Sequence, residues 1–133
     1  MELTIFTDGA SRNNPGESGV GIYILRDGEP YAQIARYLGT TTNNIAEYTA
    51  AIIGLERAVQ AGAKRVNLFA DSELMVKQLN GQYKVKNEGL KPLHAKVKEL
   101  IARIGSVAVQ YIPREKNKEA DALANRAIDE KII

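Results

Sequence analysis

The stretch Leu3-Thr4-Ile5-Phe6-Thr7-Asp8-Gly9-Ala10-Ser11 predicts a buried strand that ends at Asp8, because a run of apolar and β-branched residues gives way there to a glycine-containing turn. The pattern returns in Val66-Asn67-Leu68-Phe69-Ala70-Asp71-Ser72, where a second apolar strand ends in an aspartate and a serine suited to cap a helix. If the two strands are parallel neighbours, their ends lie about 4.8 Å apart and bring two carboxylates together. Such carboxylates repel each other unless a cation lies between them.

Working outward from these strands, turn residues and periodicity predict the element order βββαβααβα. The first three strands form an antiparallel meander with a hairpin turn at Asp27-Gly28, and residues 11–19 form a polar loop. The first helix joins strand three to strand four, as a crossover to a parallel strand requires. The sequence therefore predicts one α/β domain, residues 1–133, whose five-stranded mixed sheet is flanked by helices, with strands four and five parallel to strand one. The expected strands are residues 3–8, 20–25, 30–38, 65–70 and 107–112. The first expected helix starts after a cap at Thr42 or Asn43 and ends at Gly62, and the other three are residues 72–79, 90–104 and 118–130.

The composition excludes several classes of protein. A chain of 133 residues can bury one core but not two. No cysteine is present, which excludes disulfides, thiolate catalysis and cysteine-based zinc sites. With no apolar run long enough to span a membrane and no signal peptide, the sequence predicts a cytoplasmic protein without a membrane partner. The net charge of +2 is too small to indicate nucleic-acid binding by itself.

Two further acids lie among residues typical of a core. Glu47 lies one turn into the first helix beside its apolar stripe, and Asp121 lies within Ala120-Asp121-Ala122-Leu123-Ala124. An isolated carboxylate in such surroundings is costly to desolvate, so each acid needs a partner. If they meet Asp8 and Asp71, ligation by oxygen alone favours Mg²⁺ or Mn²⁺. Two such ions about 4 Å apart can support phosphodiester hydrolysis.

In order and spacing, these motifs resemble those of the type 1 ribonuclease H family. The resemblance covers essentially the whole chain and implies a ribonuclease H-like fold. It also implies a metal-dependent endonuclease that hydrolyses the RNA strand of RNA·DNA hybrids with two Mg²⁺ (or Mn²⁺) ions, leaving 5′-phosphate and 3′-hydroxyl ends. The matching segments are Thr7-Asp8-Gly9-Ala10-Ser11 with Asn14-Pro15-Gly16, Thr42-Asn43-Asn44-Ile45-Ala46-Glu47, Ala70-Asp71-Ser72 and Asn117-Lys118-Glu119-Ala120-Asp121-Ala122-Leu123-Ala124.

By this likeness, each acid has an expected role. Asp8 bridges both ions, and Asp121 completes the ion that holds the attacking water. Glu47 and Asp71 complete the ion at the leaving oxygen, and Glu47 also accepts a hydrogen bond from a ribose 2′-hydroxyl. The helix N-terminus beside Thr42 is suited to a DNA phosphate. Nucleic-acid contacts are expected from Arg12, Asn14, Thr42, Asn43, Asn44 and Ser72, and further phosphate contacts from Lys84, Lys86, Lys91, Arg114, Lys116 and Lys118.

The chain departs from the family pattern in two places. Many members carry a histidine in the loop before the last helix that helps to release product, whereas residues 113–117 contain none. Arg114 or Glu115 is expected to take that part. Residues 82–89 are a short basic link in a chain without tryptophan, whereas some members have a longer, tryptophan-containing basic protrusion. We expect weaker substrate binding with the chemistry intact, no separate hybrid-binding domain before Met1, and a monomer.

Two other functions are compatible with parts of this pattern. One is a different nuclease of the same broad fold, such as a junction resolvase or an integrase-type enzyme, which would cut DNA strands in preference to hybrid RNA. The other is a non-catalytic module that binds hybrids or RNA, although a pure binder would gain by losing clustered negative charge near phosphates. His94, the only histidine, is expected on a solvated helix surface. The metal used in the cell, cleavage of double-stranded RNA and the physiological task are open at this stage.

Overall fold

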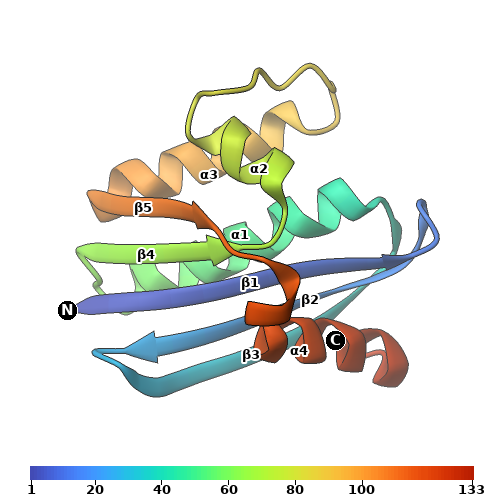
Figure 1. The fold of residues 1–133 in the computed structure, drawn as a ribbon, viewed down its shortest axis with the longest axis horizontal. Coiled ribbons are helices and arrows are strands. Elements are labelled where there is room, and N and C mark those ends of the chain that lie inside the picture. The colour runs from blue at the N-terminus through green and yellow to red at the C-terminus, as the bar shows by residue number, and fades with distance from the viewer.

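The five strands form one mixed sheet in the order β3-β2-β1-β4-β5 (Figure 1), in a computed structural model that describes residues 1–133. The strands are β1 (Glu2–Arg12), β2 (Gly16–Arg26), β3 (Glu29–Thr41), β4 (Arg65–Ala70) and β5 (Ser106–Tyr111). The helices are α1 (Asn43–Gln60), α2 (Glu73–Leu79), α3 (Lys91–Ile104) and α4 (Lys118–Glu130), and η1 (Arg114–Lys116) is one 3₁₀ turn. Pairing is antiparallel between β1 and β2 and between β2 and β3, whereas β4 is parallel to β1 and β5 to β4. The predicted fold class, element order and strand directions are confirmed.

Helices cover both faces of the sheet. On one face α1 packs against β1 and β2 with α3 beside it, and on the other α4 crosses β1, β2 and β3 (Figure 1). The main core lies between the sheet and the first of these layers. Each large apolar side chain buried there stabilises the fold by about 1.5–3 kcal/mol before the cost of chain entropy is subtracted. None of the helices is both long and apolar enough to cross a bilayer. The fully buried core side chains include Leu3, Ile5, Ile22, Ile24, Leu55, Leu68 and Leu100.

The first two strands are longer than the sequence indicates. A loop is predicted over residues 11–19, but β1 continues to Arg12 and β2 begins at Gly16, so only residues 13–15 form the turn. The prediction is wrong because polar and glycine residues also suit strand ends: a Cβ atom on Gly19 would lie 2.8 Å from the carbonyl oxygen of Ala124 in α4, and Ser18 finds a partner on β3. The hydroxyl of Ser18 donates to the carbonyl oxygen of Thr41 at 3.2 Å.

Asp8 consequently lies inside a strand and does not end it. On one side of β1, Asp8 is paired with Gly21 of β2. On the other side, the pairing with β4 stops one residue earlier, where Thr7 is opposite Ala70. Asp8 is therefore the first residue of β1 beyond the end of β4, and this register places it beside Asp71.

Two glycines let helices approach the sheet closely. A Cβ atom on Gly9 of β1 would lie 2.3 Å from the carbonyl carbon of Ala46 in α1. A Cβ atom on Gly21 of β2 would lie 2.1 Å from the carbonyl oxygen of Ala120 in α4. Both neighbours are backbone atoms, which cannot move aside as the end of a flexible side chain can. The close approach also brings in the acid that follows each alanine.

Substitution of Gly21 tests this packing. Gly21→Ala should lower the free energy of unfolding by about 1–3 kcal/mol, because α4 must move away from β2 to admit the methyl group. Urea denaturation followed by circular dichroism measures the loss. In the control Gly89→Ala, the added Cβ meets only the side-chain oxygen of Asn87, at 3.1 Å. The control should stay within about 0.5 kcal/mol of the wild type. Wild-type stability of Gly21→Ala would contradict the packing described here.

Candidate active site

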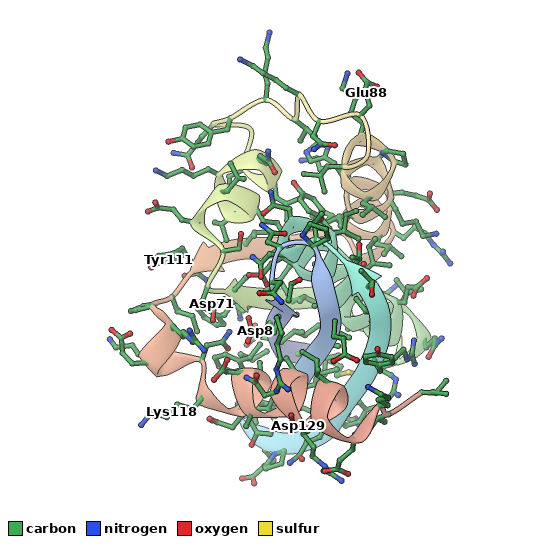
Figure 2. All side chains as sticks on the ribbon, turned by 90° about the vertical axis from the view of Figure 1, so that its right-hand side faces the viewer. Asp8, Asp71, Glu88, Tyr111, Lys118 and Asp129 are labelled. Carbon is green, nitrogen blue, oxygen red and sulfur yellow. The ribbon has the colours of Figure 1, made fainter.

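Four acidic side chains meet where β1 passes the end of β4. Asp8 on β1, Glu47 on α1 and Asp71 after β4 each offer a carboxylate oxygen, and these three oxygens lie within 4.8 Å of one another. Asp121, in the first turn of α4, lines the same cavity, and its charge adds to the rise in the pKa of Asp8. Figure 2 shows Asp8 and Asp71 next to each other near the centre of this end of the molecule. Residues 8, 47, 71 and 121, far apart in the sequence, therefore form one acidic cluster.

Glu47 is held by the backbone of β1. The amide N–H of Gly9 donates to Oε1 of Glu47 at 2.8 Å, and the Glu47 side chain is buried. The start of α1 is itself fixed, because the hydroxyl of Thr42 accepts from the amide of Ile45 at 3.2 Å as an N-cap. The close contact at Gly9 and this hydrogen bond together determine where the carboxylate lies.

Two asparagines, neither of which the sequence indicates as a site residue, support the acidic cluster. The side-chain amide of Asn117 donates to the carbonyl oxygen of Thr7 at 2.9 Å and to Oδ2 of Asp71 at 3.2 Å. The amide of Asn125 donates to the backbone oxygen of Asp121 at 3.0 Å and to its Oδ1 at 3.3 Å. The position of Asn125, one helical turn after Asp121, could have indicated its contact. An asparagine directly before a helix, like Asn117, is ordinarily interpreted as a cap.

The cluster forms one wall of an open, polar cavity of about 390 Å³. Only one of its lining residues is hydrophobic, which is unlike a pocket for an apolar small molecule. Two arginines also line it, but Arg12 pairs with Asp129 and Arg114 with Asp121, and neither forms an ion pair with the other three acids of the cluster. These three carboxylates therefore lack a cationic side chain as partner.

Burial and mutual repulsion keep protons on this cluster. Burial, with the charges of Glu47 and Asp71 adding to it, raises the pKa of Asp8 to about 9. Burial likewise raises the pKa of Glu47 to about 8, with Asp71 adding to the rise and the Gly9 N–H opposing it. A divalent cation would reverse the balance by favouring the ionised carboxylates. The donor set, all oxygen and within 4.8 Å, fits Mg²⁺ or Mn²⁺.

The residues expected to contact nucleic acid lie around this end of the molecule, but several of them already form contacts within the protein. Arg12 lines the cavity, yet its guanidinium pairs with Asp129 of α4 at 2.6 Å. Oδ1 of Asn14 accepts from the backbone amide of Asn43 at 3.0 Å and so holds the β1–β2 turn against the start of α1. Asn44 is half-buried in the first turn of that helix. Thr42 and Ser72 use their hydroxyl oxygens to cap α1 and α2.

The two candidates for product release lie in different surroundings. The guanidinium of Arg114 lies 3.4 Å from Oδ1 of Asp121 and lines the cavity, although 77% of the side chain is exposed. Glu115 is exposed on η1 and is not among the residues that line the cavity. Of the two residues, only Arg114 therefore lies at the cavity.

The expectation for His94 is wrong. The ring is half-buried, with Nε2 3.2 Å from the carbonyl oxygen of Gln78 and an edge-on contact to Tyr48 at 6.4 Å between ring centres. His94 faces α2 because it lies toward the apolar side of α3. The lysines beside it in the sequence do not indicate this orientation. His94 is not among the residues that line the acidic cavity.

Removing one charge from the cluster should stabilise the metal-free protein. The pKa of Asp8 is about 9 in the fold against an ordinary 3.8, so the folded state binds more protons than the unfolded state between these values. Stability without metal therefore falls as the pH rises from about 4 to about 9. Asp8→Asn in EDTA should raise the Tm by several degrees at pH 8, on the order of 1–3 kcal/mol, and by much less at pH 5.

Thermal unfolding at both pH values measures this difference. The control Glu29→Gln removes an exposed acid of β3 and should leave the Tm nearly unchanged at either pH. An Asp8→Asn variant that melts below the wild type at pH 8 in EDTA would mean that the carboxylates do not repel one another as described.

Comparisons with known proteins agree with this geometry. Residues 6–127 match the family described as reverse transcriptase-like. The bifunctional protein Rv2228c of Mycobacterium tuberculosis is 37% identical over 131 residues, which cover 97% of this chain and 36% of that protein. Ribonuclease HI of Halobacterium salinarum is 38% identical over 126 residues, covering 94% of this chain and 63% of that protein. The chain thus spans about a third of the mycobacterial relative and less than two thirds of the archaeal one.

Solved structures match over nearly the full length of both chains. RNase H1 from Halobacterium salinarum superposes with a TM-score of 0.94 at 37% identity, covering 98% of this chain and 99% of that one. LC11-RNase H1, solved in complex with an RNA/DNA hybrid, superposes with a TM-score of 0.92 at 41% identity, covering 97% and 98%. The acidic cluster and the strand order of the sheet agree with these comparisons, which show that the chain belongs to the type 1 ribonuclease H family.

Proposed function

We propose that this protein hydrolyses the RNA strand of RNA·DNA hybrids with two divalent ions, Mg²⁺ or Mn²⁺, leaving 5′-phosphate and 3′-hydroxyl ends. The observation that carries the proposal is the convergence of Asp8, Glu47 and Asp71 within 4.8 Å, with Asp121 beside them. The hybrid bound to LC11-RNase H1, a protein 41% identical to this chain, supports the choice of substrate.

The four carboxylates would hold the ions. Asp8 interacts with Glu47 and Asp71 and also with Asp121, so it is the acid that both ions would share. Glu47 and Asp71 would complete one site and Asp121 the other. When bound, the ions would activate a water, neutralise the scissile phosphate and stabilise the leaving oxygen.

The protein's own groups would orient the substrate. Oε1 of Glu47 accepts the Gly9 N–H, which fixes the plane of this carboxylate so that it can accept a hydrogen bond from a ribose 2′-hydroxyl. Asn14 and Asn43 form a hydrogen-bonded edge beside the cavity that would contact the two backbones of the hybrid. The positive end of the α1 helix dipole, beside Thr42, would favour a DNA phosphate nearby. Recognition of this kind reads backbone and shape and requires no base sequence.

Arg114 would help the product to leave. Its guanidinium pairs with Asp121, yet most of the side chain is exposed and able to turn toward solvent. A positive group at this edge would attract the new 5′-phosphate and compete for it with the site. This role would replace that of the loop histidine found in many family members.

A substrate panel tests the proposed function. A labelled RNA·DNA hybrid should be cut in its RNA strand with Mg²⁺ or Mn²⁺ and not in EDTA, faster than a DNA duplex. Asp8→Asn and Asp71→Asn should each lower kcat at least about a thousandfold, a loss of about 4 kcal/mol in transition-state stabilisation. The control Asp27→Asn, in the exposed β2–β3 hairpin, should cut at the wild-type rate.

The same panel can contradict the proposal. Hybrid cleavage by Asp8→Asn at the wild-type rate would show that the chemistry lies elsewhere. Preferential cutting of DNA strands would indicate a resolvase- or integrase-type nuclease. Hybrid binding that is unchanged by EDTA, with no cleavage under either ion, would indicate a binding module.

Substitution of Arg114 tests product release. Arg114→Ala should lower kcat about tenfold under multiple turnover while leaving the single-turnover rate nearly unchanged, because only the step after chemistry is slowed. Rapid-quench kinetics on a labelled hybrid separate the two rates. Arg103→Ala, in the last turn of α3, removes an exposed charge that does not line the cavity and should leave both rates near wild type. An equal fall in both rates for Arg114→Ala would place Arg114 in the chemical step instead.

A further inference from the structure

Asn117 lies where three segments that carry the acidic cluster meet. It directly precedes α4 and is 1% exposed. Its backbone oxygen accepts the N–H of Asp121 at 3.0 Å, which is the first backbone hydrogen bond of α4. Its side-chain amide reaches Thr7, the neighbour of Asp8 on β1, and Asp71, the residue after β4. One side chain therefore joins β1, the end of β4 and the start of α4.

The orientation of this amide is determined by its partners. Thr7 offers a carbonyl oxygen and Asp71 a carboxylate oxygen, so both can only accept. Turning the amide over would place its oxygen against these two oxygens. In the observed orientation both bonds are made by Nδ2, at 2.9 and 3.2 Å.

The helix gains nothing from this side chain. An asparagine at the N-cap normally accepts a backbone N–H of the first turn through its Oδ1. Here Asn117 makes no side-chain cap bond, and its Oδ1 is buried without a hydrogen-bond partner. A buried acceptor left unsatisfied destabilises the fold. The side chain thus does not cap α4 and leaves its own acceptor unpaired, while its amide contacts one acid of the cluster, Asp71, and the backbone of Thr7, the residue before Asp8.

Asp71 is the acid of the cluster that most needs such a contact. Asp8 is held in the β1–β2 ladder, and Glu47 accepts the Gly9 N–H. Asp71 lies outside β4, in the short bend before α2, and is half-buried. The amide of Asn117 supplies the hydrogen bond that fixes the rotation of its carboxylate.

We propose that Asn117 is a positioning residue that sets the orientation of the Asp71 carboxylate and its separation from Asp121. It acts through these two acids and does not itself touch the substrate. The inference deepens the proposed function and rests on it for what the site is used for, but the expected effect on metal binding can be measured without any nucleic acid. Hydrogen-bond partners of this kind typically change metal affinity or activity by about 10- to 100-fold.

Two substitutions at Asn117 separate positioning from simple stabilisation. Asn117→Ala removes the amide, and Asn117→Ser removes it while supplying a side chain that caps helices well. The matched control is Asn80→Ala, because Asn80 also lies at a helix end and its amide donates to a strand carbonyl, that of Val109, at 3.0 Å. Asn80 is not among the residues that line the acidic cavity.

Three measurements are made on each variant: Tm, the affinity for Mn²⁺ alone by isothermal titration calorimetry, and kcat with KM on a labelled hybrid. Both Asn117 variants should bind Mn²⁺ at least about tenfold more weakly and lose at least about tenfold in kcat, with KM within about twofold of wild type. Asn117→Ser should melt above Asn117→Ala yet lose as much Mn²⁺ affinity. Asn80→Ala should lower the Tm and change neither Mn²⁺ affinity nor kcat.

Several results would overturn the inference. These are Mn²⁺ affinity within twofold of wild type in both Asn117 variants, a rise in KM without a fall in kcat, or an equal loss of Mn²⁺ affinity in Asn80→Ala. If the wild type fails to cut the hybrid with either ion, the proposed function fails, and the Mn²⁺ titration alone decides the role of Asn117.

Discussion

Repulsion among buried carboxylates is the constraint on which the rest of this structure depends. Asp8 and Glu47 are at most 6% exposed, and both lie within 4.8 Å of Asp71. The fold holds them there because hydrophobic burial elsewhere outweighs the electrostatic cost. The β1–β4 register, and the close approach of α1 to Gly9 and of α4 to Gly21, leave the acids no room to separate. The electrostatic repulsion is local, and a divalent cation would relieve it.

The polar contacts around the acids are arranged before any ligand arrives. Gly9 donates its backbone N–H to Glu47, Asn117 donates to Asp71, and Asn125 donates to Asp121. Each donor restricts the rotation of a carboxylate, so little reorganisation is needed when charge is bound. The open cavity leaves room for an extended polyanion, in keeping with recognition through backbone and shape. The groups proposed for chemistry and those proposed for recognition therefore lie at the same end of the sheet.

Much of this architecture could be predicted from sequence, and the failures have physical causes. The order of strands and helices along the chain follows from hydrophobic period, turn residues and capping residues, which act locally. The position of Asp8 within its strand is not evident from the sequence. β1 stays paired with β2 beyond Asp8, whereas its pairing with β4 stops at Thr7, and only the three-dimensional register shows this difference. The contacts of Asn117 with Thr7 and Asp71 cannot be predicted from the sequence, because a capping position does not reveal where the side chain points. His94 depends on how α3 packs on α2, which the polar residues around it conceal.

The most direct test of the central claim is the number of protons released when Mg²⁺ or Mn²⁺ binds, measured by calorimetry at pH 7 in buffers of different ionisation enthalpy. With pKa values of about 9 for Asp8 and about 8 for Glu47, both acids carry protons before the ion arrives. The account predicts release of at least about one proton per protein on binding. Ion binding with no proton release would contradict it, because the carboxylates would then already be ionised and their repulsion relieved by other means.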